Sequence, residues 1–171
     1  MNFRRFLAPG SIELRLRTRA QPEGELPEGF DPESPSNLNR IREEVILELT
    51  KLLEATGEVA SHHKLFRDLH DREKRAVTAV GEGIAFPHVR TLQAKSFIMA
   101  FGRSPEGLPF RAPDGEPVQL FFAMAAPPYE DRTYLKVYSS LTKLLLVPEH
   151  REQFLLAEDP SEILRALELV R

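Results

Sequence analysis

The chain has 171 residues, of which 42% are hydrophobic and 29% are charged, with a formal net charge of -3. These values are typical of a globular protein and predict one compact domain over residues 1–171, with no charge footprint for nucleic acid. The lack of cysteine excludes disulfides, thiolate metal sites and a cysteine nucleophile. The lack of cysteine also fits a reducing compartment, so we expect a cytoplasmic protein. No apolar run is long enough to span a bilayer, so we expect no direct membrane insertion.

The first part of the chain contains a predicted strand and a proline-rich loop. Residues 11–17 alternate apolar and charged side chains, which is typical of a strand with one buried face. From about residue 20 to residue 37, four prolines and two glycines interrupt any regular pattern. We interpret this segment as a passive surface insertion that Phe30 anchors to the body of the protein.

Two helices are predicted after this loop. Apolar residues recur at helical spacing from Ile41 to Leu53, and Gly57 is a suitable C-terminal cap. A second helix is expected from Ser61, as its N-cap, to about Asp71. It carries three histidines, His62, His63 and His70. Because no carboxylate or cysteine stands at a suitable spacing, we interpret these histidines as exposed polar residues rather than metal ligands.

The second half of the chain predicts central strands followed by helices. Residues 96–103 and 118–126 are nearly continuous apolar runs, which are typical of strands covered on both faces. Helical patterns follow over residues 134–145, after Pro148, and after Asp159, which is a suitable N-cap. Strands interspersed with helices indicate a layered α/β fold with helices on both faces of the sheet.

Residues 81–88 place one histidine, His88, directly after a short apolar run and a proline. Gly81 and Gly83 permit turn conformations, residues 84–86 can form a buried strand, and Pro87 fixes the backbone before the imidazole. A rigidly supported side chain of this kind suits a reactive group, although a lone histidine after a strand can equally be a hydrogen-bonded structural residue.

Four segments of the chain resemble the mannitol/fructose/nitrogen-regulatory type of enzyme IIA (EIIA) of the bacterial phosphotransferase system (PTS). They are Gly-Glu-Gly-Ile-Ala-Phe-Pro-His-Val-Arg at 81–90, Arg-Glu-Lys at 72–74, Phe-Arg-Ala-Pro-Asp-Gly-Glu-Pro-Val at 110–118, and Phe-Phe-Ala-Met-Ala-Ala-Pro at 121–127. The resemblance covers nearly the whole chain except the loop near the N-terminus. It implies a three-layer α/β/α sandwich with a mixed central sheet flanked by helices.

The same resemblance implies a phosphoryl carrier. His88 is the expected phosphoryl acceptor, Arg72 is expected to stabilise the phosphate, and Tyr134 replaces the second histidine of the family. A tyrosine donates a hydrogen bond but cannot become a cation, so stabilisation is expected to be weaker; Arg90 and Arg132 are candidates to compensate. The implied partners are the histidine phosphocarrier protein HPr as donor and an enzyme IIB (EIIB) or a regulatory protein as acceptor. No cofactor or metal is required.

Two other functions stay open at this point. The leading interpretation is a phosphotransferase component rather than a stand-alone enzyme. The first alternative is a nitrogen-regulatory binding module that acts on a kinase or transcriptional partner with weak or no onward transfer. A metal-binding or hydrolytic enzyme that uses the histidines is the least favoured alternative. The sequence identifies neither a sugar nor an oligomeric state.

Overall fold

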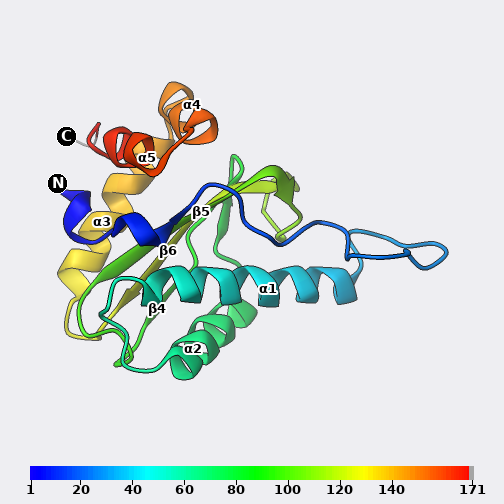
Figure 1. Ribbon diagram of the computed structural model, residues 1–171, viewed down its shortest axis with the longest axis horizontal. Helices are drawn as coiled ribbons and strands as arrows, with labels where there is room; N and C mark the ends of the chain where they lie inside the picture. The colour runs from blue at the N-terminus through cyan, green and yellow to red at the C-terminus, as the bar shows by residue number, and fades with distance from the viewer. Residues whose placement is uncertain (170–171) are drawn as a thin grey trace.

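The computed structural model describes residues 1–169, and a mixed six-stranded sheet lies at its centre (Figure 1). The strands follow the order β1-β5-β6-β3-β2, and β4 also pairs with β6. They are β1 (Ile12–Glu13), β2 (Ala79–Gly81), β3 (Ile84–Ala85), β4 (His88–Arg90), β5 (Ile98–Leu108) and β6 (Val118–Ala126). Strands β5 and β6 are antiparallel, whereas β3 and β4 run parallel to β6, which makes the sheet mixed as predicted.

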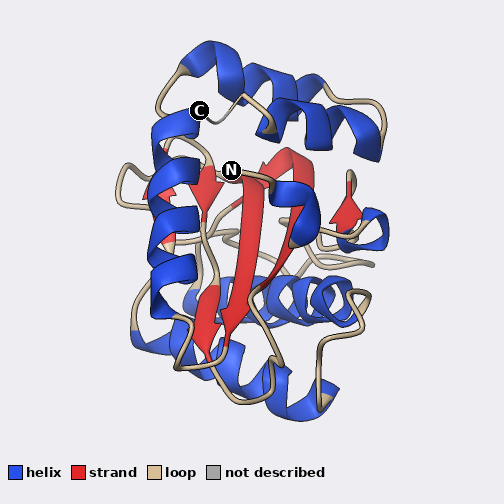
Figure 2. Ribbon diagram, turned by 90° about the vertical axis from the view of Figure 1, so that its left-hand side faces the viewer, coloured by secondary structure: helices blue, strands red, loops and turns tan. Residues whose placement is uncertain are grey.

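Helices cover both faces of the sheet, so the predicted three-layer sandwich is confirmed (Figure 2). The helices are α1 (Pro35–Glu54), α2 (His62–Arg75), α3 (Asp131–Leu145), α4 (Pro148–Leu156) and α5 (Pro160–Leu167), and two 3-10 turns, η1 (Phe3–Arg5) and η2 (Pro9–Ser11), precede β1. Helices α1 and α2 pack on one face, and α3, α4, α5 and η1 pack on the other. No helix within residues 1–169 has the length and apolar character needed to cross a bilayer.

The helix starts follow from local sequence. The Ser34 hydroxyl accepts a hydrogen bond from the Asn37 amide at 3.3 Å, and Pro35 occupies the first turn of α1. Asp159 does the same for α5, where its carboxylate accepts from the Ser161 amide at 2.8 Å and Pro160 begins the helix. Each such cap satisfies amides that the helix leaves unpaired and stabilises it by about 1 kcal/mol.

The predicted strand over residues 11–17 is wrong in length, because only Ile12 and Glu13 are in β1. Side chains bind the backbone groups that a longer strand would use. Glu13 accepts from the Arg15 amide at 3.0 Å, and Glu48 on α1 accepts from the amides of Arg17 and Thr18 at 2.6 and 3.0 Å. These side-chain hydrogen bonds replace ladder pairing at Arg15, Arg17 and Thr18. The Leu16 amide still donates to the Arg103 carbonyl of β5 at 2.8 Å, and the side chains of Ile12 and Leu16 are buried.

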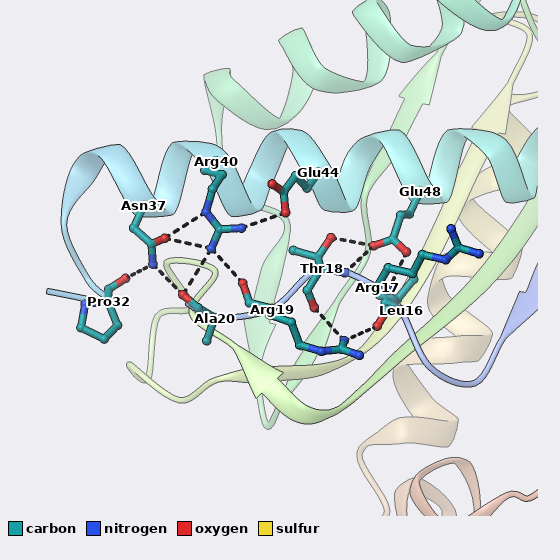
Figure 3. A network of polar contacts seen from close by, with 10 residues as sticks. All are labelled: Leu16, Arg17, Thr18, Arg19, Ala20, Pro32, Asn37, Arg40, Glu44 and Glu48. Atoms are coloured by element: carbon teal, nitrogen blue, oxygen red, sulfur yellow. Dashed lines mark hydrogen bonds and ion pairs between the residues drawn. The ribbon is translucent and has the colours of Figure 1, made fainter. Parts of the chain in front are cut away.

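The loop at about residues 20–37 extends beyond the N-terminal end of α1 (Figure 1), and its last residues belong to that helix, which begins at Pro35. Asn37 and Arg40 hold its base (Figure 3). The Asn37 side-chain amide donates to the carbonyls of Ala20 and Pro32 at 2.8 and 2.7 Å, and Arg40 donates to Arg19 and Ala20 carbonyls. The expected anchor, Phe30, is half-buried but belongs to neither core, so polar contacts fix the loop.

Candidate functional site

His88 is the first residue of β4, and hydrogen bonds fix the backbone on both sides of it. The Phe86 amide donates to the Thr78 carbonyl at 3.1 Å, and the Met124 amide of β6 donates to the Pro87 carbonyl at 2.9 Å. Because strand side chains alternate, His88 shares a face with Phe86 and Met124, both of which lie in the core beneath α3. The fold therefore holds the imidazole between the sheet and α3.

The two nitrogens of the His88 ring have different partners. Nδ1 lies 2.7 Å from the Phe86 carbonyl oxygen, and Nε2 lies 3.4 Å from Nη2 of Arg72. A carbonyl only accepts, so Nδ1 carries the proton that is donated to it. In the neutral ring the lone pair is then on Nε2, on the side of the guanidinium. The ring is half-buried rather than sealed inside the protein.

Arg72 reaches this position because α2 is longer than predicted: it ends at Arg75 and not near Asp71. Arg72 Nη1 donates to the Ala76 carbonyl at 2.9 Å, which satisfies a carbonyl at the end of the helix. The next residue, Glu73, is buried, and its carboxylate accepts from the amide and hydroxyl of Thr78 at 3.0 and 2.6 Å. These contacts fix the end of α2 against β2, and with it the guanidinium beside His88.

Two tyrosines of α3 form an aromatic wall beside the imidazole. The ring centroid of His88 lies 5.3 Å from that of Tyr134 and 6.2 Å from that of Tyr138. The Arg90 guanidinium lies over the Tyr134 ring at 5.9 Å and pairs with the carboxylate of Asp131 at 3.0 Å. A second cation is therefore held on the same face as His88, two residues further along β4.

The surroundings set the charge of the site. Burial, together with the Arg72 and Arg90 guanidinium groups, lowers the pKa of His88 below its ordinary value of 6.5, against the opposing effect of its hydrogen bond to the Phe86 carbonyl. Burial and the neighbouring Tyr138 raise the pKa of Tyr134 to about 12. At neutral pH the site thus offers a neutral imidazole, two cations and a protonated phenol.

Comparison with known proteins assigns the chain that carries this site to a protein family. Residues 37–169 match the profile of the phosphoenolpyruvate-dependent sugar phosphotransferase system EIIA 2 family. The chain belongs to the EIIA 2 family. The resemblance of the four sequence segments is thereby confirmed, and membership supports a phosphoryl-carrier or a regulatory role.

The relatives of this EIIA 2 chain include sugar-specific and nitrogen-regulatory proteins. It is 35% identical to the PTS fructose-specific EIIABC component of Bacillus subtilis over 72% of this chain and 19% of that protein. It is 34% identical to the fructose-specific EIIA component of Haloferax volcanii over 63% of this chain and 70% of that protein. The chain spans about a fifth of the length of the first curated relatives, whose further segments it does not match.

Solved structures agree with the EIIA 2 assignment. The nitrogen regulatory protein IIA-Ntr of Neisseria meningitidis is 33% identical and superposes with a TM-score of 0.68 over 73% of this chain and 85% of that one. The IIA mannitol protein of Escherichia coli is 27% identical, with a TM-score of 0.63 over 74% and 88% of the two chains. A mannitol-specific enzyme IIA of Escherichia coli also has a structure in complex with phosphorylated enzyme IIB.

Not every residue expected near His88 lies there in this EIIA 2 chain. Arg132 lines a separate surface depression with Arg5 and Glu130. The turn at Gly81 and Gly83 has left-handed backbone angles, but its central amide, that of Glu82, donates to the Asp114 carboxylate at 2.9 Å. An amide already paired with a carboxylate is not a ready phosphate donor.

Two residues beside His88 are not predicted from the sequence as part of the site. Tyr138 lies within the helical pattern predicted over residues 134–145, and Asp131 precedes that pattern. Their positions were a usable signal, because Tyr138 follows Tyr134 by one helical turn and Asp131 precedes it by three residues. Residues at these spacings share a helix face, so a site that includes Tyr134 also includes both neighbours.

The histidines of α2 have separate surroundings. A His62 ring nitrogen lies 2.8 Å from a carboxylate oxygen of Glu54, and the His70 ring stacks on that of Phe66 with centroids 5.4 Å apart. Within residues 1–169, no three His, Asp or Glu side chains gather in a way that could hold a metal ion.

Proposed function

We propose that residues 1–171 form one EIIA type-2-like domain, with the proline-rich loop at about 20–37 as an insertion, that carries a phosphoryl group in the cytoplasm. The carrier accepts the group on His88 from the phosphohistidine of HPr and passes it to the cysteine of an EIIB. Family membership and the fructose-specific relatives support this proposal. An EIIB acceptor is supported by the complex of a related enzyme IIA with enzyme IIB.

The single observation that carries the proposal is the hydrogen bond between His88 Nδ1 and the Phe86 carbonyl. It places the lone pair on Nε2, which can attack the phosphorus atom of phospho-HPr without a separate base. A new bond forms between Nε2 and phosphorus as the donor's phosphorus–nitrogen bond breaks, and the donor imidazole leaves with that electron pair. In the second step the EIIB thiolate attacks phosphorus, and the Nε2–phosphorus electron pair returns to the His88 ring.

Three side chains are suited to bind the transferred group. The Arg72 Nη2 group lies 3.4 Å from Nε2, in the space that the phosphorus atom enters. The guanidinium therefore has to shift aside on phosphorylation, and from the shifted position it can donate to a phosphoryl oxygen. Arg90 supplies a second positive charge on the same face of β4, and Tyr134 keeps its hydroxyl proton because the pKa is about 12. Phosphoryl transfer depends mainly on such positioning and charge stabilisation, so no metal or nucleotide is needed at this site.

The test is phosphorylation by a complete donor system. Incubation with phosphoenolpyruvate, enzyme I and HPr should add one phosphoryl group, measured by intact-protein mass, and His88→Ala should abolish the addition. The modification should be acid-labile, as a phosphorus–nitrogen bond is. His63→Ala is the matched control, because His63 is an exposed histidine on α2 and should leave phosphorylation unchanged. Full phosphorylation of His88→Ala would refute the assignment.

A regulatory role is the second candidate, because relatives of both kinds are present. The nitrogen regulatory protein of Bradyrhizobium diazoefficiens is 30% identical over 70% of this chain and 76% of that protein, and the IIA-Ntr structure of Neisseria meningitidis is also similar. In this role phosphorylated His88 changes binding to a kinase or transcriptional partner. Transfer from the phosphorylated chain to purified EIIB supports the carrier; recovery of a regulatory partner, with no transfer to EIIB, supports regulation.

A further inference from the structure

Two arginines far apart in the sequence meet at one neutral oxygen. Arg42 on α1 donates from Nη2 to the side-chain oxygen of Asn39 at 3.1 Å, and Arg111, in the loop after β5, donates from Nη2 to the same oxygen at 3.0 Å. Neither arginine is in an ion pair within residues 1–169. Two positive groups therefore share a single uncharged acceptor.

The backbone of Arg111 is in an unfavourable conformation for this residue type. Its φ is 55°, in the left-handed region that glycine, asparagine and aspartate adopt most readily. An arginine there costs roughly 1 kcal/mol relative to glycine, and the exposed guanidinium makes no ion pair in the described chain to offset that cost. Such an outlier points to a role for the side chain outside folding.

One donor of the pair has no hydrogen-bond partner in the described chain, although it is buried and therefore not open to a ligand. Nε of Arg42 is buried without a hydrogen-bond partner, which is uncommon for a guanidinium nitrogen. The pKa of Arg42 is lowered by burial and then by the positive charge of Arg111, against the attraction of Glu73 and Glu43. The pair therefore lacks an anion even though two carboxylates lie within electrostatic range, and the carboxylate of Glu73 is already bound to Thr78.

We propose that Arg42 and Arg111 form an anion-binding site for the phosphate group of a small molecule. The hollow that both arginines line with Leu38, Glu73, Val77 and Phe110 has a volume of about 10 Å³, which is room for one water molecule and not for a phosphate. The phosphate therefore binds at the exposed surface, where it displaces the side-chain oxygen of Asn39. Paired guanidinium forks match the oxygens of a phosphate, and the Asn39 oxygen marks where a negatively charged oxygen binds between them. The anion-binding site shares none of the side chains proposed to contact phosphate at His88, although Glu73, which lines its hollow, also holds the end of α2 that carries Arg72. The inference is independent of the proposed carrier function.

The nearby charges limit what can bind. His70 and Lys74 lie within electrostatic range on α2, and Arg42 contributes to lowering the pKa of His70, after burial. Glu43 and Glu73 oppose a highly charged ligand. These surroundings favour one compact phosphate group over a polyanion, and a free phosphate ion or a phosphorylated metabolite both provide that chemistry.

The test is a calorimetric titration of the full chain at constant ionic strength with two probes, inorganic phosphate and glycerol 3-phosphate. Because the His88 site can also bind phosphate, the titration is repeated in the double variant His88→Ala with Arg72→Gln. We expect saturable binding at millimolar probe in both proteins. Arg42→Gln and Arg111→Gly should each weaken that binding at least tenfold, whereas Arg17→Gln, which changes an exposed arginine elsewhere, should not.

A measurement of thermal unfolding shows whether a variant loses phosphate binding because it has lost the site or because it is less stable. Arg111→Gly removes the backbone strain, so its midpoint of unfolding should equal or exceed that of the parent protein while binding is lost. Stronger binding of glycerol 3-phosphate than of phosphate identifies a metabolite as the source of the anion, and equal binding identifies the free ion. The proposal would be overturned if neither probe bound saturably. It would also be overturned if binding disappeared in the His88 and Arg72 double variant but persisted in Arg111→Gly.

Discussion

Two arginines on the sheet and its covering helices show opposite uses of the same side chain. Arg103 on β5 donates from Nε to the Leu14 carbonyl at 3.0 Å, and from Nη1 to the carbonyls of Phe154 and Ala157, both at 2.8 Å. Arg72 on α2 makes one carbonyl contact, to Ala76, and turns its other nitrogen toward the His88 ring. Arg103 connects backbone segments, whereas Arg72 has one nitrogen that faces His88 instead of a carbonyl, as its proposed contact with a phosphoryl group requires.

The difference between these two arginines lies in their hydrogen-bond partners and not in residue type or burial, and it agrees with a structural role for Arg103 and with the role proposed for Arg72. Both side chains are only partly exposed, and neither forms an ion pair in the part of the chain that the structure describes. The comparison predicts that changes at Arg103 mainly affect stability, and that changes at Arg72 mainly affect transfer, since Arg72 makes only one carbonyl contact.

The largest effect is expected for Arg103→Met. Methionine keeps the apolar part of the side chain but leaves the carbonyls of the segment before α1 and of the end of α4 without their donor. We expect the free energy of unfolding to fall by about 3 kcal/mol, since each unsatisfied buried group costs about 1–3 kcal/mol. Urea unfolding measures this, with Arg15→Gln on the exposed surface as control. A decrease in the free energy of unfolding below about 0.5 kcal/mol would contradict the structural role assigned to Arg103.

Arg72→Gln should have the next largest effect, on transfer and not on folding. Loss of one charge-assisted contact to the phosphoryl group costs about 1.5–3 kcal/mol, which slows phosphorylation by HPr by roughly 10- to 150-fold. Single-turnover rates under the same donor concentration measure the change, and Arg72→Lys should recover part of the rate. An unchanged rate would show that the contact to His88 is incidental.

Arg90→Gln should have a smaller effect, because Arg90 is already paired with Asp131 and has no direct hydrogen bond to His88. A rate reduction of roughly three- to tenfold is expected, equivalent to about 0.6–1.4 kcal/mol. Arg132→Gln is the matched control, since Arg132 is a nearby arginine that lines a different depression. Equal effects of the two substitutions would mean that Arg90 acts only through overall charge.

The smallest effect concerns pH. NMR titration should place the pKa of His88 below 6.5, and Arg72→Gln or Arg90→Gln should raise it, because each removes a cation that disfavours the imidazolium. The folded protein then binds a proton less readily than the unfolded chain, so His88 reduces stability as pH falls below about 6.5 and has no effect above that range. A pKa above 6.5 would contradict the described burial and charges.

The fold was largely predictable because its central elements have strong local signals. The apolar run at 118–126 became β6 with the predicted limits, and Asp159 caps α5 as expected. The strand predicted at 11–17 is wrong in length because the carboxylates of Glu13 and of Glu48, which lies on α1, accept from amides of this segment, and hydrophobic periodicity does not report such contacts.

Prediction of the site was limited by distance along the chain. Short sequence segments were enough to identify His88 and Arg72 as candidate site residues. The contact between them could not be predicted, because it depends on where α2 ends. That end is fixed by the buried Glu73 and its two hydrogen bonds to Thr78. Local sequence patterns do not predict this contact. The Arg42 and Arg111 pair is a similar case, since its members are brought together only when the loop after β5 packs beside α1.

The most direct test of the carrier mechanism is which nitrogen of His88 becomes phosphorylated. Phosphorus and nitrogen NMR of the chain after reaction with HPr should show one phosphoryl group on Nε2, with the Nδ1 proton retained in its hydrogen bond to the Phe86 carbonyl. A phosphoryl group on Nδ1, or on any residue other than His88, would contradict the mechanism.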